Sequence, residues 1–519
     1  MQRLHGNILH RGIKLDSTLP ALLERAVSIH GPSPLIVFDD GSAMSYAEAA
    51  SLSRDIAGRL QASGVGRGER VVSVSAASAE AALVFWASMS TGAIFIPLDS
   101  AIPPEKLGRI LKRTAPKALF MAPDYPDKAA LAGFNTVSYR TDGEGADGIK
   151  GFSEWLQEGG GELELEEVSP ADDAVVLFTS GTSGEPKGVV LSHGALCASG
   201  KLMADAYRWG PEDRLLSTGD FHTMSGLRNP CVAAMHAGAS FVIAPHAERS
   251  NAVSAAALMA RLGATILCTV PAFLAQFTRF AEKVPKGFAK GLRYAMCTGT
   301  SLPTAAEEAI ERLYGVPVLN YYGLTETSGI CIGVLPGMEK EYRGTIGVPL
   351  GSTMIKIDAQ GLAESGELLI KTDNLMSRYY GEPDGGEAVT EGWYRTKDLC
   401  RIRPDGSIEL IGRIDDAFKD QRGELVHPTE IEKALEGCSR VLEAAVCGFD
   451  NEDGRPGTAA FIVLKEKGCD ERAIAHELRH EALRALGPRR TPALFRFVDA
   501  LPRGTNGKIL RRRLREELA

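Results

Sequence analysis

The sequence predicts an α/β protein with a large N-terminal domain of helix-covered sheets, a barrel-like β subdomain within it, and a small α+β domain at the C-terminus. Through most of the chain, short β-branched runs alternate with longer stretches rich in alanine and leucine. Strand-like segments then follow one another from about residue 345 to 411, and the composition changes again near Gly412. We therefore divide the chain into residues 1–413 and 414–519.

The N-terminal alternation is clearest between residues 70 and 98, where a strand-like run (70–75) and a helix-like run (79–89) precede a second strand (93–97). Such an order indicates parallel sheets covered by helices. The uncharged run 81–98 approaches the length of a membrane span, but serine, threonine and glycine interrupt its middle. We expect a buried helix, a glycine turn and a buried strand there, and no membrane span.

The β subdomain and the C-terminal domain follow from local patterns. Segments reading MIKI, GELLI, WYRTKDLCRI and SIELIG predict mostly antiparallel strands within 345–411. Beyond Gly412 the pattern predicts helices at 428–436 and 471–486, strands at 444–449 and 459–464, and a basic tail. That is enough chain for one small domain.

Composition narrows the functional classes. With 44% hydrophobic and 24% charged residues in 519, the chain is not disordered. The net charge of -8 gives no reason to expect a nucleic-acid partner. Nine cysteines without a CxxC pair, and an N-terminus without an apolar core, favour a reducing cytoplasm over secretion.

Residues 175–193, VVLFTSGTSGEPKGVVLSH, carry the most informative chemistry. A strand leads into glycines and short hydroxyl side chains, and Lys187 follows; inward-turned amides, hydroxyls and an ammonium suit polyphosphate oxygens. A Walker A loop is excluded because Gly188, and not serine or threonine, follows Lys187. The segment therefore predicts nucleotide phosphate binding by another architecture.

Three further segments add complementary groups. In NYYGLTET (320–327), a tyrosine ring can stack on a purine, and Thr325 and Glu326 offer a hydroxyl and a carboxylate to phosphate and metal. If this motif stood alone, packing of Tyr321 and Tyr322 in the core would be the preferred explanation. Asp398, after a strand in WYRTKDL, suits ribose hydroxyls. Lys508 in LPRGTNGKILR places a flexible ammonium at a loop tip, and the motif alone could equally be a solvated or polyanion-binding tail.

In order and over nearly the whole chain, these segments resemble the adenylate-forming superfamily of acyl-CoA synthetases, peptide-synthetase adenylation domains and beetle luciferases. The resemblance implies that Lys508, Glu326 and Thr325 are catalytic, and that Glu326 holds Mg²⁺ with Thr182 as a candidate second ligand. It further implies an ATP- and AMP-binding set made of Thr179, Ser180, Gly181, Thr182, Ser183, Gly184, Lys187, Gly299, Thr300, Tyr322, Asp398 and Arg413.

The resemblance also makes the C-terminal domain mobile, with Asp415 as the hinge about which it rotates. It places Thr298, Gly323 and Gly329 along the acyl pocket, together with His222, for which a packed core histidine is almost as good an interpretation. Gly423 belongs to the loop facing the CoA tunnel. Two departures from the family pattern are Lys397, where glycine is usual, and one extra residue within 419–423.

The implied function is ATP-dependent activation of a carboxylic acid to an acyl-adenylate, with pyrophosphate release, followed by transfer to CoA. The longer 419–423 loop leaves open transfer to a carrier-protein phosphopantetheine, and a non-catalytic ATP- and acid-binding protein is a remote alternative. His222 stands where amino-acid-activating members carry an aspartate, which favours an acid without an α-amino group. The expected cofactors are ATP, Mg²⁺ and CoA.

One motif points elsewhere. His476 to His480 reads HELRH, and histidines four residues apart on a helix can share a zinc ion. A zinc hydrolase also needs a third ligand, and the residues downstream offer no convincing candidate. We expect a solvated helix face instead.

Overall fold

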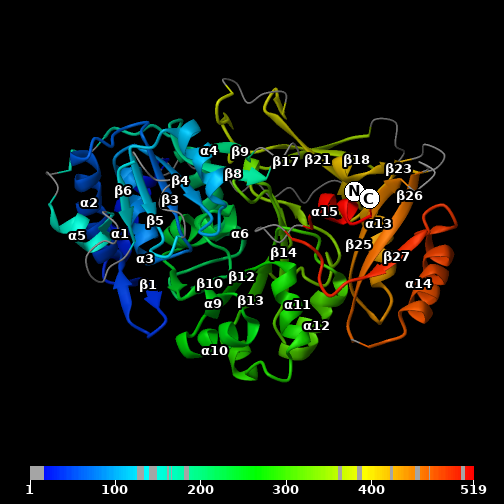
Figure 1. Ribbon diagram of the computed structural model, residues 1–519. Coiled ribbons are helices and arrows are strands. Elements are labelled where there is room, and N and C mark those ends of the chain that lie inside the picture. Colours follow the sequence, from blue (N-terminus) through cyan, green and yellow to red (C-terminus); the bar gives the residue numbers. More distant parts are fainter. Residues whose placement is uncertain are drawn as a thin grey trace, which may run out of the picture.

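The computed structural model in Figure 1 describes residues 17–125, 134–139, 149–159, 163–164, 166–180, 186–359, 365–382, 388–420, 425–450, 456–466, 468–503 and 509–518. Six predicted site residues lie outside the described residues: Gly181, Thr182, Ser183, Gly184, Gly423 and Lys508. The same holds for the side chain of Ser180.

Within these ranges, the first sheet has nine strands, of which six neighbours in the middle run parallel. Antiparallel strands complete both edges. Its order is β16 (Val348–Pro349), β15 (Ile332–Gly333), β14 (Val318–Tyr322), β13 (Tyr294–Cys297), β12 (Ile266–Thr269), β10 (Arg214–Ser217), β11 (Ser240–Ile243), β1 (Pro34–Phe38) and β2 (Ala43–Ser45).

The second sheet has eight described strands, parallel from β8 to β7 and closed at its other edge by two antiparallel partners. Its order is β19 (Arg378–Tyr379), β9 (Pro186–Ser192), β8 (Asp173–Ser180), β4 (Ile94–Leu98), β3 (Arg70–Val74), β5 (Ala118–Met121), β6 (Thr136–Ser138) and β7 (Lys150–Gly151). Two helix-covered, largely parallel sheets confirm the predicted fold class.

Helices cover both faces of each sheet, so the strands are buried on both sides. In β12, Ile266 and Cys268 face one hydrophobic core and Leu267 faces another. The central core joins the two sheets through α1 (Leu19–His30), α2 (Tyr46–Ala62), α3 (Ala79–Ser90), α5 (Phe152–Gln157), α6 (His193–Ala206), α7 (Met224–Arg228) and α8 (Ala234–Ala237). The outer layers contain α4 (Pro104–Thr114) on one sheet and α9 (His246–Arg249), α10 (Ala252–Leu262), α11 (Pro271–Arg279) and α12 (Thr304–Tyr314) by the other.

The uncharged run is the predicted helix, turn and strand. Helix α3 is buried on almost all sides, Gly92 takes a φ of +68°, and all of β4 is buried. Among the described residues, no helix is both long and apolar enough to cross a bilayer.

A smaller antiparallel sheet follows, as the sequence predicted for 345–411. Its strands, as far as this segment is described, are β17 (Met354–Asp358), β18 (Gly366–Lys371), β20 (Val389–Thr390), β21 (Trp393–Ile402) and β22 (Ile408–Arg413). Strand β21 lies in the middle and pairs with β18, β20 and β22. Through β22, it is paired directly with the last strand of the predicted N-terminal domain.

The C-terminal domain lies beside this antiparallel sheet (Figure 1). After a one-turn helix (Ile414–Asp416) and the pair β23 (Phe418–Lys419) and β24 (Leu425–Val426), it has the sheet β25 (Val441–Asp450), β26 (Pro456–Leu464) and β27 (Leu494–Phe497). Helices α13 (Pro428–Glu436) and α14 (Glu471–Leu486) cover one face, and α15 (Arg511–Glu516) covers the other. Both long helices have the predicted bounds.

We expect the N-terminal domain to lose stability in acid through His193, which is buried at the start of α6. Its Nδ1 accepts a hydrogen bond from the Leu19 backbone, and burial lowers its pKa to about 4, against the opposing charge of Asp172. Since the unfolded chain binds this proton more tightly, stability falls as pH drops from 6.5 toward 4, by up to ~3 kcal/mol.

Thermal unfolding at several pH values tests this expectation. His193→Asn keeps an acceptor but cannot be protonated, so its unfolding midpoint should fall less steeply in acid than that of the native chain. His480→Asn, on an exposed helix position, should keep the native slope. An unchanged slope in His193→Asn would contradict the assignment.

Candidate functional site

The Asp398 carboxylate is the centre of the candidate site. It is 3% exposed in β21, accepts a hydrogen bond from the Tyr322 hydroxyl at the end of β14, and lies 3.0 Å from Arg413 Nη1 at the end of β22. Burial, followed by the charge of Asp398, raises the pKa of Tyr322 well above its usual value, so its hydroxyl stays a donor. The structure thus brings together three residues predicted to contact one nucleotide.

Lys397 adopts the backbone conformation that favours glycine. Its φ is +59°, in the left-handed region, and its backbone N–H donates to Glu367 Oε1 at 2.9 Å. Lys397 thus occupies, within β21 and opposite the register shift between Glu367 and Leu369, the left-handed position at which the resemblance predicted glycine. Its ammonium Nζ is also 3.3 Å from Asp415 Oδ2, the predicted hinge residue.

Tyr379, which the sequence did not single out, connects Glu326 to β9, the strand that follows the predicted phosphate loop. The Tyr379 hydroxyl donates to Glu326 Oε1 at 3.0 Å, and the Lys187 ammonium is 5.1 Å from the centre of the Tyr379 ring. Thr179 pairs with Lys187 across the loop, with its hydroxyl 3.4 Å from the Lys187 carbonyl. A carboxylate and a cation therefore meet where the sequence predicted phosphate and metal.

Gly299 follows β13 with a φ of +103°, between the half-buried Thr298 and Thr300. Gly323 and Gly329 approach each other so closely that a Cβ on Gly323 would meet the Gly329 backbone at 2.3 Å. Small residues are thus required on this wall of the predicted acyl pocket.

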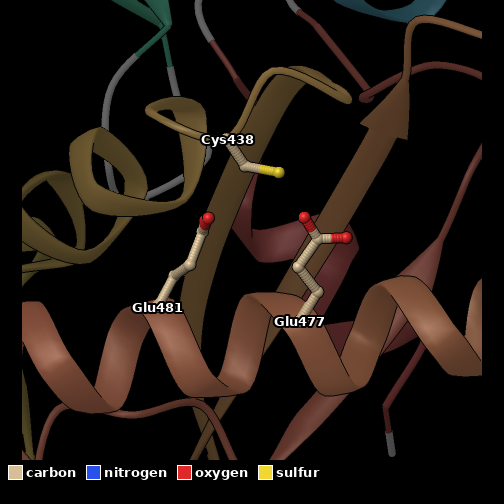
Figure 2. A group of neighbouring side chains, drawn as sticks. All are labelled: Cys438, Glu477 and Glu481. Atoms are coloured by element: carbon tan, nitrogen blue, oxygen red, sulfur yellow. The ribbon is translucent and has the colours of Figure 1, made fainter.

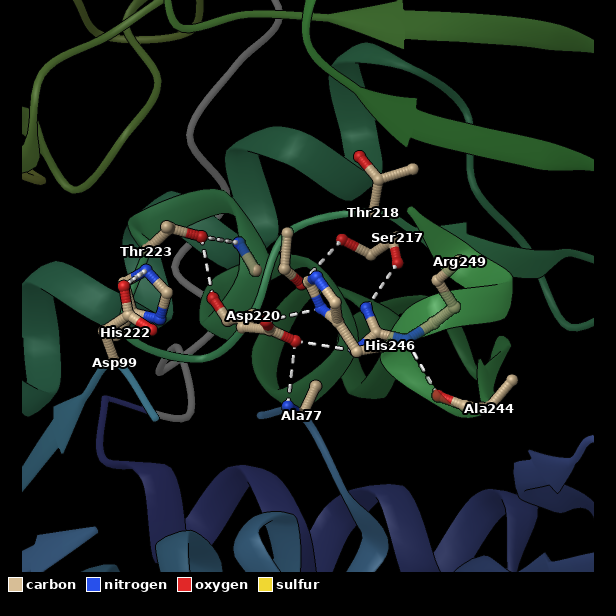
Figure 3. A network of polar contacts seen from close by, with 12 residues as sticks. Ala77, Asp99, Ser217, Thr218, Asp220, His222, Thr223, Ala244, His246 and Arg249 are labelled. Atoms are coloured by element: carbon tan, nitrogen blue, oxygen red, sulfur yellow. Dashed lines mark hydrogen bonds and ion pairs between the residues drawn. The ribbon is translucent and has the colours of Figure 1, made fainter. Parts of the chain in front are cut away.

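His222 is largely buried, and neither ring nitrogen has a hydrogen-bond partner among the described residues. Its Nε2 is 3.8 Å from Asp99 Oδ2, and burial lowers its pKa despite that carboxylate. In Figure 3, the neighbouring Asp220 instead points toward the Ala77 amide, His246 and Arg249. An unpaired imidazole fits a pocket wall better than a packed core histidine.

The base of the Lys508 loop is anchored, although Lys508 itself is not described. Arg503 and Ile509 form an antiparallel bridge on either side of it. Arg511 forms a two-pronged ion pair with Glu432 and lies 3.5 Å from Asp416. Asp415, the predicted hinge residue, thus pairs with Lys397 of the N-terminal domain, whereas the neighbouring Asp416 pairs with Arg511 of the C-terminal domain.

The HELRH segment does not form a zinc site in the part of the chain that the structure describes. The rings of His476 and His480 lie side by side, 4.8 Å apart, but no third His, Cys, Asp or Glu joins them. Glu477 points with Glu481 toward Cys438 instead (Figure 2) and is 3.5 Å from Arg440. Both histidines are exposed on α14.

No cysteine offers itself as a nucleophile within the described chain, which includes all nine. Eight are buried, Cys469 is partly exposed, and none forms a disulfide in the described structure. Burial raises the pKa of Cys268 to about 12 and that of Cys447 to about 11. The site therefore depends on hydroxyl, carboxylate and cationic groups.

This chain belongs to the AMP-binding enzyme family: that family matches residues 23–380, and the C-terminal domain of AMP-binding enzymes matches residues 430–508. A sulfoacetate–CoA ligase from Cupriavidus necator is 30% identical to it, over 96% of this chain and 97% of the relative. A 4-hydroxybenzoate–CoA/benzoate–CoA ligase from Rhodopseudomonas palustris is 28% identical, over 95% and 93%.

Solved structures show the same fold. A benzoate CoA ligase from Burkholderia xenovorans superposes with a TM-score of 0.86 at 25% identity, covering 96% of this chain and 99% of that one. ATP-bound MatB from Rhodopseudomonas palustris superposes with a TM-score of 0.85 at 25% identity, covering 96% and 98%.

We expect Asp398→Asn to weaken ATP binding by about 10- to 100-fold, because a charged acceptor at a buried site contributes ~1.5–3 kcal/mol. Titration calorimetry with ATP measures the change. Asp405→Asn, in an exposed turn of the same subdomain, should bind ATP like the native chain. Equal affinities for all three proteins would exclude Asp398 from the nucleotide site.

The left-handed conformation of Lys397 can be tested by substituting this residue and measuring the unfolding midpoint. Lys397→Gly should stay within ~1 kcal/mol of the native stability, since relief of backbone strain offsets loss of an exposed ion pair. Lys397→Val should be less stable than Lys397→Gly by at least ~1 kcal/mol, because a β-branched residue is strained at this φ. If the valine and glycine variants unfold at the same midpoint, Lys397 does not have the left-handed backbone conformation described here.

Proposed function

We propose that this protein is an AMP-forming acid–CoA ligase. A carboxylate oxygen of the acid attacks the α-phosphorus of ATP, pyrophosphate leaves, and the thiol sulfur of CoA then attacks the acyl carbon, with AMP leaving. The convergence of Tyr322, Asp398 and Arg413 at one buried point, in a chain of this family, is the observation that carries the proposal.

The relatives support CoA as the acceptor. Those named above, aligned over nearly their whole length, are CoA ligases, and none of them is described as acting on a carrier protein. Sulfoacetate and benzoates also lack an α-amino group, which agrees with His222 standing in place of an amine-binding aspartate. A non-catalytic binding protein would have no need of Lys508 and Glu326, the groups assigned below to the adenylation step.

For nucleotide binding, we assign the ring of Tyr322 to adenine and the carboxylate of Asp398 to the ribose hydroxyls. Gly299 and Thr300 would lie along the adenine, and the Thr179 to Lys187 segment would enclose the phosphates. This assignment agrees with the depth of each group: Tyr322 and Asp398 are buried, whereas Lys187 is exposed at the loop.

Adenylation brings two anions together, so the site must supply positive charge. Lys187 and Lys508 are the cations we assign to this task, and Thr325 to the α-phosphate. No general base is required, because the acid is already ionised at neutral pH. Since Tyr379 occupies one oxygen of Glu326, the second remains for Mg²⁺, which prefers carboxylate oxygen and would neutralise phosphate charge.

For the second step, we propose that the domain after residue 413 rotates about Asp415, withdraws Lys508 and brings the loop containing Gly423 to the CoA tunnel. The exposed ion pair between Lys397 and Asp415 is weak enough to break during such a movement. A cytoplasmic location remains a prediction from the sequence.

A panel of carboxylic acids tests the activity. With ATP and Mg²⁺, at least one acid should release pyrophosphate, and addition of CoA should yield its thioester. No release with any acid would contradict adenylation, and thioester formation on a carrier protein but never on CoA would contradict the acceptor.

The role of Lys508 in adenylation can be tested separately from thioester formation. Lys508→Ala should lower pyrophosphate release by at least ~100-fold, since it removes a charge made for the transition state, while thioester formation from supplied acyl-adenylate persists. Lys465→Ala, at an exposed position of the same domain, should match the native rates. Equal loss of both steps in Lys508→Ala would contradict a role confined to adenylation.

A further inference from the structure

Arg228 and Arg249 are among the largest side chains of the described chain that are fully buried, at 0% and 1% exposure. Arg249 has a counterion: its Nη2 is 2.6 Å from Asp220 Oδ1, and its other donors bond to backbone carbonyls of Ala244 and Ser217. Figure 3 shows this closed network. Among the described residues, no carboxylate forms an ion pair with Arg228.

Arg228 is surrounded by neutral groups. Its Nε and Nη2 donate to Asn229 Oδ1 at 3.0 and 2.7 Å, and Nη1 donates to the Ser328 carbonyl at 3.2 Å. The guanidinium carbon is 5.7 Å from the centre of the Tyr321 ring. These contacts orient the guanidinium but leave its charge uncompensated in the interior, where an unpaired charge is strongly disfavoured.

The uncompensated cation lies against the predicted acyl pocket. A Cβ built on Gly329 would come within 3.3 Å of Arg228 Nη1 and 2.6 Å of Met224 Cγ. Arg228 ends α7, whose preceding loop carries His222, and a π-helical turn at Asn229–Ala233 follows directly. Irregular turns of this kind occur frequently at functional sites.

The chain limits how far Arg228 can lie from Thr325, the residue assigned above to the α-phosphate. Ser328, which Arg228 contacts, is three residues after Thr325, and three residues span at most about 10 Å. An acid whose carboxyl group reacts near Thr325 therefore reaches Arg228 with a short chain of a few carbons.

We propose that the acid substrate carries a second anionic group, a carboxylate or a sulfonate, and that Arg228 binds this group at the end of the acyl pocket. This inference rests on the proposed function and specifies its substrate class. A planar guanidinium with free donor capacity is well suited to either anion. The bound anion supplies the counter-charge that no described carboxylate provides to Arg228.

Matched pairs of acids provide the test. Malonate is compared with 3-methylbutanoate, succinate with 4-methylpentanoate, and sulfoacetate with 3,3-dimethylbutanoate, so that each pair differs mainly in the distal charge. For the native enzyme, kcat/KM of pyrophosphate release should favour the charged member of at least one pair by about 100-fold or more. The pair that responds distinguishes a dicarboxylate from a sulfonate.

Arg228→Met should lower kcat/KM for the charged acid by about 100-fold, and should keep or raise it for the neutral partner. Asn229→Asp is a second variant that leaves Arg228 in place. It introduces a carboxylate where the amide oxygen now accepts, so it should raise the unfolding midpoint and selectively lower activity on the charged acid. If Arg228→Met does not fold, Asn229→Asp still tests whether Arg228 binds the second anionic group.

Arg249→Met is the matched control for burial. It leaves Asp220 buried without its cation, so it should lower the unfolding midpoint more than Arg228→Met does. A native preference for the neutral acids would overturn the proposal. So would an equal loss on both members of a pair in Arg228→Met, which would mean that Arg228 binds the reacting carboxylate.

Failure of the proposed function has a different signature, namely no pyrophosphate release with any acid. In that case, the three charged acids are tested by their effect on the unfolding midpoint. A rise in the native chain that is absent in Arg228→Met supports the anion site without turnover, and no rise with any of them rejects it.

Discussion

A buried carboxylate must find its counter-charge and hydrogen bonds within the protein, and Asp398 meets this requirement with residues from two other strands. The Tyr322 hydroxyl comes from the end of the large parallel sheet, and the Arg413 guanidinium comes from the last strand before the C-terminal domain. One buried side chain therefore connects the large sheet, the antiparallel subdomain and the segment that leads to the C-terminal domain. The candidate nucleotide site is built around that same group.

Local sequence patterns predicted those helices, turns and strands that are determined by neighbouring residues in the chain. The bounds of helices 428–436 and 471–486 and the helix, turn and strand across 81–98 followed from periodicity and breaker residues. Contacts between distant residues did not follow: Tyr379 and Glu326 are 53 residues apart, and Arg228 and Ser328 are 100 apart. Neither Tyr379 nor Arg228 lies in a segment with a recognisable motif, so tertiary packing alone reveals them.

The hinge segment combines weak and strong contacts. The pair between Lys397 and Asp415 is largely exposed, whereas Arg511 is buried in its pair with Glu432, inside the C-terminal domain. Exposed pairs contribute little and exchange readily with water, while breaking a buried pair is costly. The ion pair between Arg511 and Glu432 is thus firmer than the one between Lys397 and Asp415, which agrees with the rotation proposed above.

The distribution of thiols has a practical consequence. Eight cysteines are buried, and Cys469, just before α14, is partly exposed. A maleimide dye should therefore react first at that position in the native protein, without prior removal of the other cysteines. A fluorophore placed there would sit on the C-terminal domain and away from the nucleotide site. The native chain thus already contains one site for labelling the C-terminal domain with a dye that would report on the proposed rotation.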